Sequence, residues 1–92
     1  MPIAILFHPV SLNAATYERA LARLEAVLGG PNPGGRRYHA CYGTGDKLSV
    51  FEVWESMAQF EMFGAVLMPI LHELGIDVGE PDIQPLQQVI VS

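Results

Sequence analysis

The order of hydrophobic patterns along the chain is the feature that most constrains its fold. Apolar residues recur at helical spacing in two segments, at about residues 13–28 and 56–74. Short β-rich runs precede, separate and follow these segments, at residues 2–8, 37–42, 48–54 and 83–91. The order strand, helix, strand, strand, helix, strand predicts a single ferredoxin-like α+β domain over residues 1–92. Such a domain has a four-stranded antiparallel sheet with both helices on one face.

A proline lies inside the second helical segment. Ser56 and Gln59 have the spacing of a capping box at its start, and Gly75 is expected to end it. Pro69 lies between these ends. Because proline lacks an amide hydrogen and its ring clashes with the preceding turn, we expect the helix to kink or restart there.

The balance of apolar and charged residues predicts an oligomer. Half of the 92 residues are apolar and only 16% are charged, so one small core cannot cover all the apolar surface. We expect the sheet face without helices to pair with that of a second copy, forming a homodimeric barrel. Strict alternation along the strands assigns five residues to this face, namely Ile3, Ile5, Phe7, Phe51 and Val53.

Charge and cysteine content argue against several classes of partner and site. The net charge is −5, and the five basic residues are scattered except for the pair at 36 and 37, so nucleic acid is not expected as a partner. Cys41 is the single cysteine, and the three histidines form no HxH or HExxH pattern, so we expect no metal. The apolar run at the N-terminus stops at His8 and is too short for a signal peptide or a membrane span. A cytoplasmic protein that does not bind membranes is predicted.

The register of the central hairpin decides whether a histidine meets a carboxylate. A two-residue turn at Gly45 and Asp46 pairs His39 with Glu52 on one face of the sheet. A loop of odd length instead places Tyr38 near Glu52 and turns His39 to the other face. Histidine is suited to proton transfer near neutral pH, and an adjacent carboxylate fixes its tautomer. The two-residue turn therefore predicts an acid–base pair, although the same two residues can equally serve as ordinary polar partners.

We expect a cleft between the mixed face of the sheet and the helices. Period-two alternation places Trp54 beside Glu52, and His8 and Gln87 are expected to join them from the outer strands. A mostly apolar cleft with few polar groups is the usual form of a small-molecule site. The candidate catalytic residues are His39, Glu52 and His8, and the candidate substrate-binding residues are Trp54, Tyr17, Gln87, Phe60 and Phe63.

A family resemblance follows from the third strand and the helix after it. Residues 51–56, with the sequence Phe-Glu-Val-Trp-Glu-Ser, followed by Phe60 and later by Pro69, Leu71 and Gly75, resemble the dimeric α+β barrel superfamily that includes the antibiotic biosynthesis monooxygenases. The resemblance implies a homodimer of facing sheets with a ligand cleft in each subunit. It also implies oxygenation without a cofactor, in which a base generates a carbanion or phenolate that itself reacts with dioxygen.

Other functions on the same fold stay open from the sequence. Proton-transfer chemistry without oxygen, such as cyclisation or isomerisation of a polyketide-like substrate, needs the same base. A ligand-binding or stress-associated dimer without activity needs no base at all. The resemblance extends to haem-degrading members, but these place a haem-ligating histidine near the position of Phe63 and Gly64 here. Because the chain departs from that pattern, we expect no haem.

Overall fold

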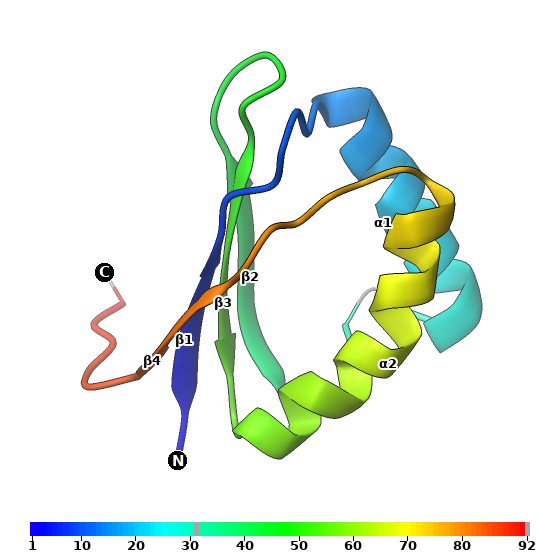
Figure 1. Ribbon diagram of the computed structural model, residues 1–92. Helices are drawn as coiled ribbons and strands as arrows, with labels where there is room; N and C mark the ends of the chain where they lie inside the picture. The colour runs from blue at the N-terminus through cyan, green and yellow to red at the C-terminus, as the bar shows by residue number, and fades with distance from the viewer. Residues whose placement is uncertain (31, 92) are drawn as a thin grey trace.

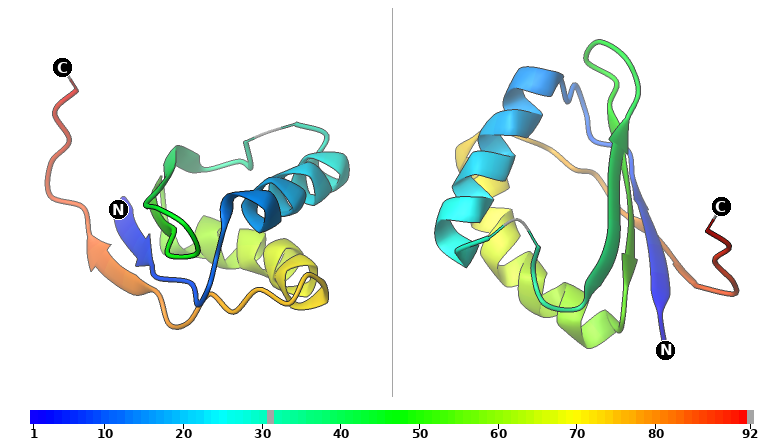
Figure 2. Two further views of the ribbon diagram at one scale, coloured as in Figure 1. Left: turned by 90° about the horizontal axis from the view of Figure 1, so that it is seen from above. Right: turned by 180° about the vertical axis from the view of Figure 1, so that it is seen from behind.

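Six secondary-structure elements follow one another in the expected order. The computed structural model of the protein describes residues 1–30 and 32–91. The elements are β1 (Ile3–Phe7), α1 (Ala14–Leu28), β2 (Arg36–Tyr42), β3 (Ser49–Trp54), α2 (Met57–Glu73) and β4 (Asp82–Pro85). The strands form an antiparallel sheet in the order β2-β3-β1-β4, and both helices cover the same face of it (Figures 1 and 2). The predicted ferredoxin-like α+β fold is confirmed.

Local signals set both ends of α1. The Asn13 side chain accepts a hydrogen bond from the Thr16 amide at 2.9 Å, which satisfies a donor that the first helical turn leaves free. At the other end Gly29 adopts a φ of 76°, and its amide donates to the Glu25 carbonyl at 2.9 Å. Glycine takes this left-handed conformation without steric cost. The start of the helix in turn fixes the position of Tyr17, whose amide donates to the Asn13 carbonyl.

The second helix continues through its proline. Ser56 caps α2 by accepting from the Gln59 amide at 3.3 Å, as the capping-box spacing predicts. The expected restart at Pro69 is wrong, because α2 is one continuous element. Pro69 lies on the exposed side of the helix, whereas the next two residues, Ile70 and Leu71, are buried. Their packing against the core holds this part of the helix in place although proline removes one backbone hydrogen bond.

The last strand is much shorter than the predicted 83–91. It ends at Pro85, which has no amide hydrogen to donate to the sheet. One further backbone bond joins the Leu86 amide to the Pro2 carbonyl at 3.0 Å. Beyond it, residues 87–91 form no strand in the described chain, and Ile90 is 83% exposed. The predicted extent of this strand is therefore wrong.

The side chains of Ile3, Ile5 and Phe7 on β1 point toward the helices, and not toward the sheet face that the helices leave uncovered. Ile5 pairs with Glu52 across the β1–β3 ladder, so both side chains lie on the same face of the sheet. Ile5 and Phe7 are buried in the core beneath the helices. The prediction that the first strand shares the outer face with Phe51 and Val53 is wrong for all three of its assigned residues, Ile3, Ile5 and Phe7. A shift of one residue in register moves every side chain to the other face, and alternation within one strand does not determine its register against another.

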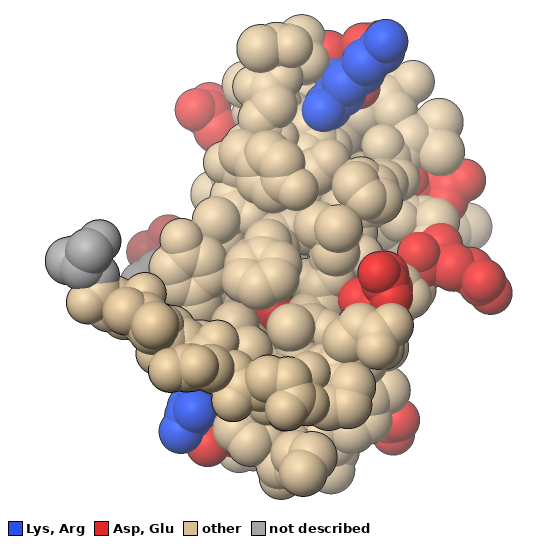
Figure 3. Space-filling model, turned by 90° about the vertical axis from the view of Figure 1, so that its left-hand side faces the viewer, with Lys and Arg blue, Asp and Glu red and all other residues tan. Residues whose placement is uncertain are grey.

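The side of the sheet without helices is still largely apolar. We call it the open sheet face and define it by Ala4, Leu6, Tyr38, Ala40, Phe51 and Val53. Figure 3 views the molecule from this side and shows mostly uncharged residues, with lysine and arginine toward the margin and a few acidic side chains within the face. Asp82 of β4 pairs with Leu6 and so lies on this side of the sheet. Tyr38 contacts Phe51 edge to face, with ring centroids 6.1 Å apart. A face of this composition is a candidate contact surface for another protein.

Candidate functional site

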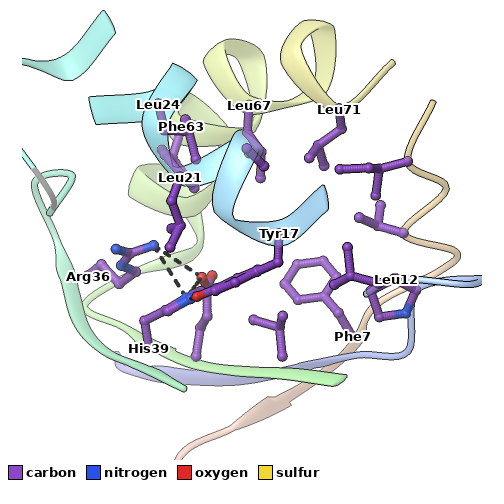
Figure 4. A pocket seen from close by; sticks show the side chains of 16 residues that line it. Phe7, Leu12, Tyr17, Leu21, Leu24, Arg36, His39, Phe63, Leu67 and Leu71 are labelled. Carbon is purple, nitrogen blue, oxygen red and sulfur yellow. Dashed lines mark hydrogen bonds and ion pairs between the residues drawn. The ribbon is translucent and has the colours of Figure 1, made fainter. Parts of the chain in front are cut away.

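A cavity of about 70 Å³ lies between the sheet and the two helices. Tyr17 and Leu21 reach it from α1, and Phe63 and Leu67 reach it from α2 (Figure 4). Its walls are apolar except where four side chains with polar groups meet on the sheet side. These are Tyr17, Arg36, His39 and Glu52. An apolar cavity with a few convergent polar groups is the usual form of a small-molecule site.

Glu52 is the centre of the polar cluster. Its Oε2 accepts hydrogen bonds from His39 Nδ1 at 2.6 Å and from Arg36 Nη1 at 3.2 Å. Its Oε1 accepts from Trp54 Nε1 at 2.9 Å. The residue is only 4% exposed, and a carboxylate so deeply buried requires such donors and charges to remain ionised.

The register of the hairpin brings the histidine and the carboxylate together. The β2–β3 ladder pairs His39 with Glu52 and Cys41 with Val50, which is the register that the two-residue turn predicts. The Lys47 amide closes this turn by donating to a carbonyl oxygen at 3.0 Å. Because directly paired residues project to the same face, both side chains point toward the helices.

A β-bulge brings in Arg36, which the sequence analysis did not identify as a site residue. Arg36 pairs with Trp54 and Tyr38 pairs with Val53, so residues 36 and 37 share one position of the ladder. Strict alternation from His39 would have placed Arg37 inside. Instead the Arg36 side chain is 7% exposed in the site, whereas Arg37 is 51% exposed and binds Glu55 on the outside. The available signal was two adjacent arginines after a pair of glycines, a context that permits a bulge.

The pKa of Glu52 lies below its ordinary value. Burial alone would raise it, but the hydrogen bonds from His39 and Trp54 and the charges of His39 and Arg36 together outweigh burial. The carboxyl group is therefore ionised at neutral pH and acts only as an acceptor. The proton between the two partners consequently resides on His39 Nδ1, which leaves Nε2 of a neutral imidazole as an acceptor.

Tyr17 is the hydrogen-bond partner of His39 Nε2. Its hydroxyl forms a hydrogen bond with His39 Nε2, and the two rings are nearly parallel, with an interplanar angle of 5° (Figure 4). Burial raises the pKa of Tyr17; Cys41 adds to this effect, Arg36 opposes it and Glu52 adds to it. The phenol therefore stays protonated at neutral pH. Glu52, His39 and Tyr17 form a continuous hydrogen-bonded chain that ends at the cavity.

The other predicted site residues lie outside the cavity lining. Trp54 is fully buried in the core against Phe60 and Phe63, and it contributes to the site through its hydrogen bond to Glu52. His8 is exposed, and its Nδ1 lies 3.1 Å from the Ser49 hydroxyl. Gln87 is also exposed, beyond the end of β4. The cavity thus brings together four of the eight predicted residues, namely Tyr17, His39, Glu52 and Phe63.

The described part of the chain contains neither a metal-binding cluster nor a membrane-spanning helix. Over residues 1–30 and 32–91, no group of three or more His, Cys, Asp or Glu side chains is arranged to hold a metal ion. None of the helices in the same ranges has the length and apolar character needed to cross a membrane.

Solved structures with this fold identify the chain's structural relatives. No protein-family model and no curated protein matches the chain. SnoaB, a cofactor-independent oxygenase from Streptomyces nogalater, is 17% identical, with a TM-score of 0.68 over 99% of this chain and 98% of its own. A proposed antibiotic biosynthesis monooxygenase from Caulobacter crescentus is 19% identical, with a TM-score of 0.63 over 97% and 91% of the two chains. Another proposed antibiotic biosynthesis monooxygenase, from Deinococcus radiodurans, is 11% identical, with a TM-score of 0.61 over 100% and 98% of the two chains. The chain therefore has the fold of the antibiotic biosynthesis monooxygenase-like proteins.

Proposed function

We propose that this protein is a cofactor-independent, monooxygenase-like enzyme that binds a small apolar or aromatic molecule and removes a proton from it. The observation that carries the proposal is the 2.6 Å hydrogen bond between His39 Nδ1 and Glu52 Oε2, at the wall of an apolar cavity. A base oriented by a buried carboxylate is the arrangement that general acid–base catalysis uses.

The charges of the cluster suit the formation of an anion. With a neutral imidazole, the charges of Arg36 and Glu52 cancel. When the proton that leaves the substrate reaches His39, the cluster gains one positive charge beside the new negative charge. Because the cavity wall is apolar, this attraction is stronger than it would be in water. The site therefore stabilises the anion once the proton has been transferred.

Dioxygen completes the proposed reaction. A carbanion formed from a CH₂ group flanked by activating groups is electron-rich and reacts with dioxygen directly. One oxygen atom enters the product as a C=O group and the other leaves as water, so CH₂ and O₂ become C=O and H₂O. SnoaB, which shares the fold, is a cofactor-independent oxygenase. That likeness supports this reaction over others of the same class.

The experiment follows proton removal separately from oxygen consumption. The probe is 2-tetralone, a bicyclic ketone whose α-hydrogens exchange with D₂O once they are removed. We expect the protein to accelerate exchange over buffer under argon, as measured by proton NMR, and to consume dioxygen in air. His39→Asn should lower the exchange rate by about 100-fold or more. His72→Gln, at an exposed position on α2, is the matched control and should leave it unchanged.

Two results would decide against the proposal. Exchange no faster than in buffer would remove proton abstraction altogether and favour a binding protein without activity. Exchange without oxygen uptake would replace the oxygenase by a cyclase or isomerase. The position of Arg36 favours this second candidate specifically, because its guanidinium lies at the wall of the same cavity and such reactions need a cation beside the oxygen of an enolate.

We also expect the enzyme to be a homodimer that pairs through the open sheet face. Phe51 lies at the centre of that face, between Leu6 and Ala40. Phe51→Asp should convert the dimer to a monomer, because the charge would be buried between two apolar sheets. Size-exclusion chromatography with light scattering measures this. Met62→Asp on the helical side, where the side chain is 73% exposed, should leave the dimer intact; a wild-type monomer would contradict the expectation.

A further inference from the structure

We propose that the Tyr17 hydroxyl, and not the imidazole of His39, takes the proton from the substrate and passes it on. This inference rests on the proposed function and deepens it in two ways. It identifies the group that touches the substrate, and it specifies the substrate as a weak acid of the enolisable ketone or phenol class.

Both nitrogens of His39 already have partners. Nδ1 lies 2.6 Å from Glu52 Oε2, and Nε2 is bonded to the Tyr17 hydroxyl. A substrate proton could therefore reach the imidazole directly only if Tyr17 moved away. The phenol oxygen, in contrast, keeps acceptor capacity after it donates to Nε2, because a hydroxyl has one donor and two lone pairs. Tyr17 also lines the cavity from α1, above the sheet (Figure 4).

The direction of the hydrogen bonds permits a relay. The ionised Glu52 accepts from Nδ1, so Nε2 of the neutral ring accepts from the Tyr17 hydroxyl. The substrate proton forms a bond to the Tyr17 oxygen while the phenolic proton moves to Nε2. The electron pair of the broken bond stays on the substrate, which becomes an enolate or phenolate. Tyr17 ends neutral and His39 ends as an imidazolium held by Glu52.

The surroundings of Tyr17 favour this coupled transfer over a standing phenolate. Burial raises the pKa of the phenol, Cys41 and Glu52 act in the same direction, and Arg36 acts against them. Its titratable and charged neighbours on the sheet are Arg36, His39 and Cys41 on β2 and Glu52 on β3. The cavity-lining residues that α2 contributes, Phe63, Leu67 and Leu71, do not titrate. A phenolate in these surroundings would be costly, whereas a phenol that gains one proton as it loses another carries no charge.

The relay also selects the substrate. Because Tyr17 ends neutral and the proton finally rests on His39, the relay requires a donor in the range of weak acids. Phenols and ketones with activated α-hydrogens fall in this range, whereas simple alcohols and alkanes do not. The remaining cavity wall is made of leucine, phenylalanine, valine and isoleucine side chains together with Pro9 and Ala20. It suits an aromatic or alicyclic body that carries one such acidic group.

The test compares Tyr17→Phe with His39→Asn in the exchange of 2-tetralone α-hydrogens. Each variant should lose about 100-fold or more of the wild-type rate. The double variant should be no slower than either single one, because both residues act in one chain. Tyr42→Phe is the matched control, since this tyrosine is half-exposed on the opposite face of the sheet. Wild-type exchange in Tyr17→Phe, or independent losses that multiply in the double variant, would overturn the inference and leave the proposed function standing.

A second measurement covers the case in which Tyr17→Phe folds poorly. Placing 3-fluorotyrosine at position 17 keeps the ring and the hydroxyl but makes the phenol more acidic. Because the relay requires the neutral phenol, the alkaline limit of the pH profile of exchange should then move to lower pH, which a purely structural role for the ring would not produce. An unchanged profile would contradict the relay. Failure of the wild type to accelerate exchange at all is a different outcome, and it removes the proposed function itself.

Discussion

Replacing Glu52 by alanine is expected to lower the free energy of unfolding by about 3–5 kcal/mol. The carboxylate is 4% exposed and lies 3.2 Å from Arg36 Nη1. The Arg36 guanidinium lies at the wall of an apolar cavity, and its side chain is only 7% exposed. Removing Glu52 takes this carboxylate away from it. A buried charge that loses its counter-charge keeps the full cost of desolvation. Urea denaturation at fixed protein concentration, followed by circular dichroism, measures the loss.

The chain contains a matched control for this prediction. Arg37 and Glu55 form a second ion pair 2.7 Å long, but their side chains are 51% and 46% exposed. Glu55→Ala should change the free energy of unfolding by less than about 1 kcal/mol. Glu52→Gln, which keeps the shape of the side chain, serves if the alanine variant does not fold. Equal losses of unfolding free energy in the Glu52 and Glu55 variants would show that burial does not make the Arg36–Glu52 pair contribute more to stability.

The same carboxylate should make stability depend on pH. Because the folded-state pKa of Glu52 lies below its ordinary value, the unfolded chain binds the proton more readily than the folded one. The contribution of Glu52 is therefore complete above its unfolded pKa of about 4.3, and it is lost as the pH falls from there through the lower folded value. In Glu52→Gln this part of the acid sensitivity should disappear. An identical acid dependence in the variant and the wild type would contradict the lowered pKa.

Trp54→Ala is expected to cost about 3–5 kcal/mol of the free energy of unfolding. Trp54 is fully buried, and its ring centroid lies 5.7 Å from that of Phe60 and 5.2 Å from that of Phe63. Alanine would leave a cavity among these rings. It would also remove the indole donor to Glu52 Oε1, so one oxygen of a buried carboxylate would lose its partner. The same denaturation experiment measures this loss.

Trp54→Phe separates packing from hydrogen bonding. Phenylalanine fills most of the space against Phe60 and Phe63 and lacks only the donor to Glu52. We expect a smaller loss of about 1–3 kcal/mol. We also expect Glu52 to bind its proton at a higher pH, because one hydrogen bond to the charged form is gone. A loss as large as that of Trp54→Ala would mean that the hydrogen bond dominates and that the ring packing adds little.

The parts of the fold that depend on nearby residues could be predicted from the sequence. The pairing of His39 with Glu52 followed from one of the two turn lengths considered, the two-residue turn at Gly45 and Asp46 a few residues away. The start of α2 followed from the spacing of Ser56 and Gln59. In both cases the chain positions the partners through bonds and turns that lie within the same short segment.

The parts that depend on distant contacts could not be predicted. The register of β1 against β3 puts Ile5 opposite Glu52, across 46 intervening residues by their sequence numbers, and no local rule specifies it. The position of Arg36 required a bulge that alternation does not contain. Tyr17 was expected to be a wall residue; its bond to His39 depends on how α1 packs over the sheet. The site thus depends largely on contacts between residues far apart in the sequence, which the hydrophobic pattern does not specify.

At the bulge at the start of β2, either of two adjacent arginines could supply the positive charge of the site. Residues 36 and 37 share one ladder position, one side chain turned inward and the other outward. Since both are arginine, a bulge displaced by one residue would still present a guanidinium to Glu52 and another to the solvent. Either position of the bulge would therefore keep a positive charge within reach of the carboxylate.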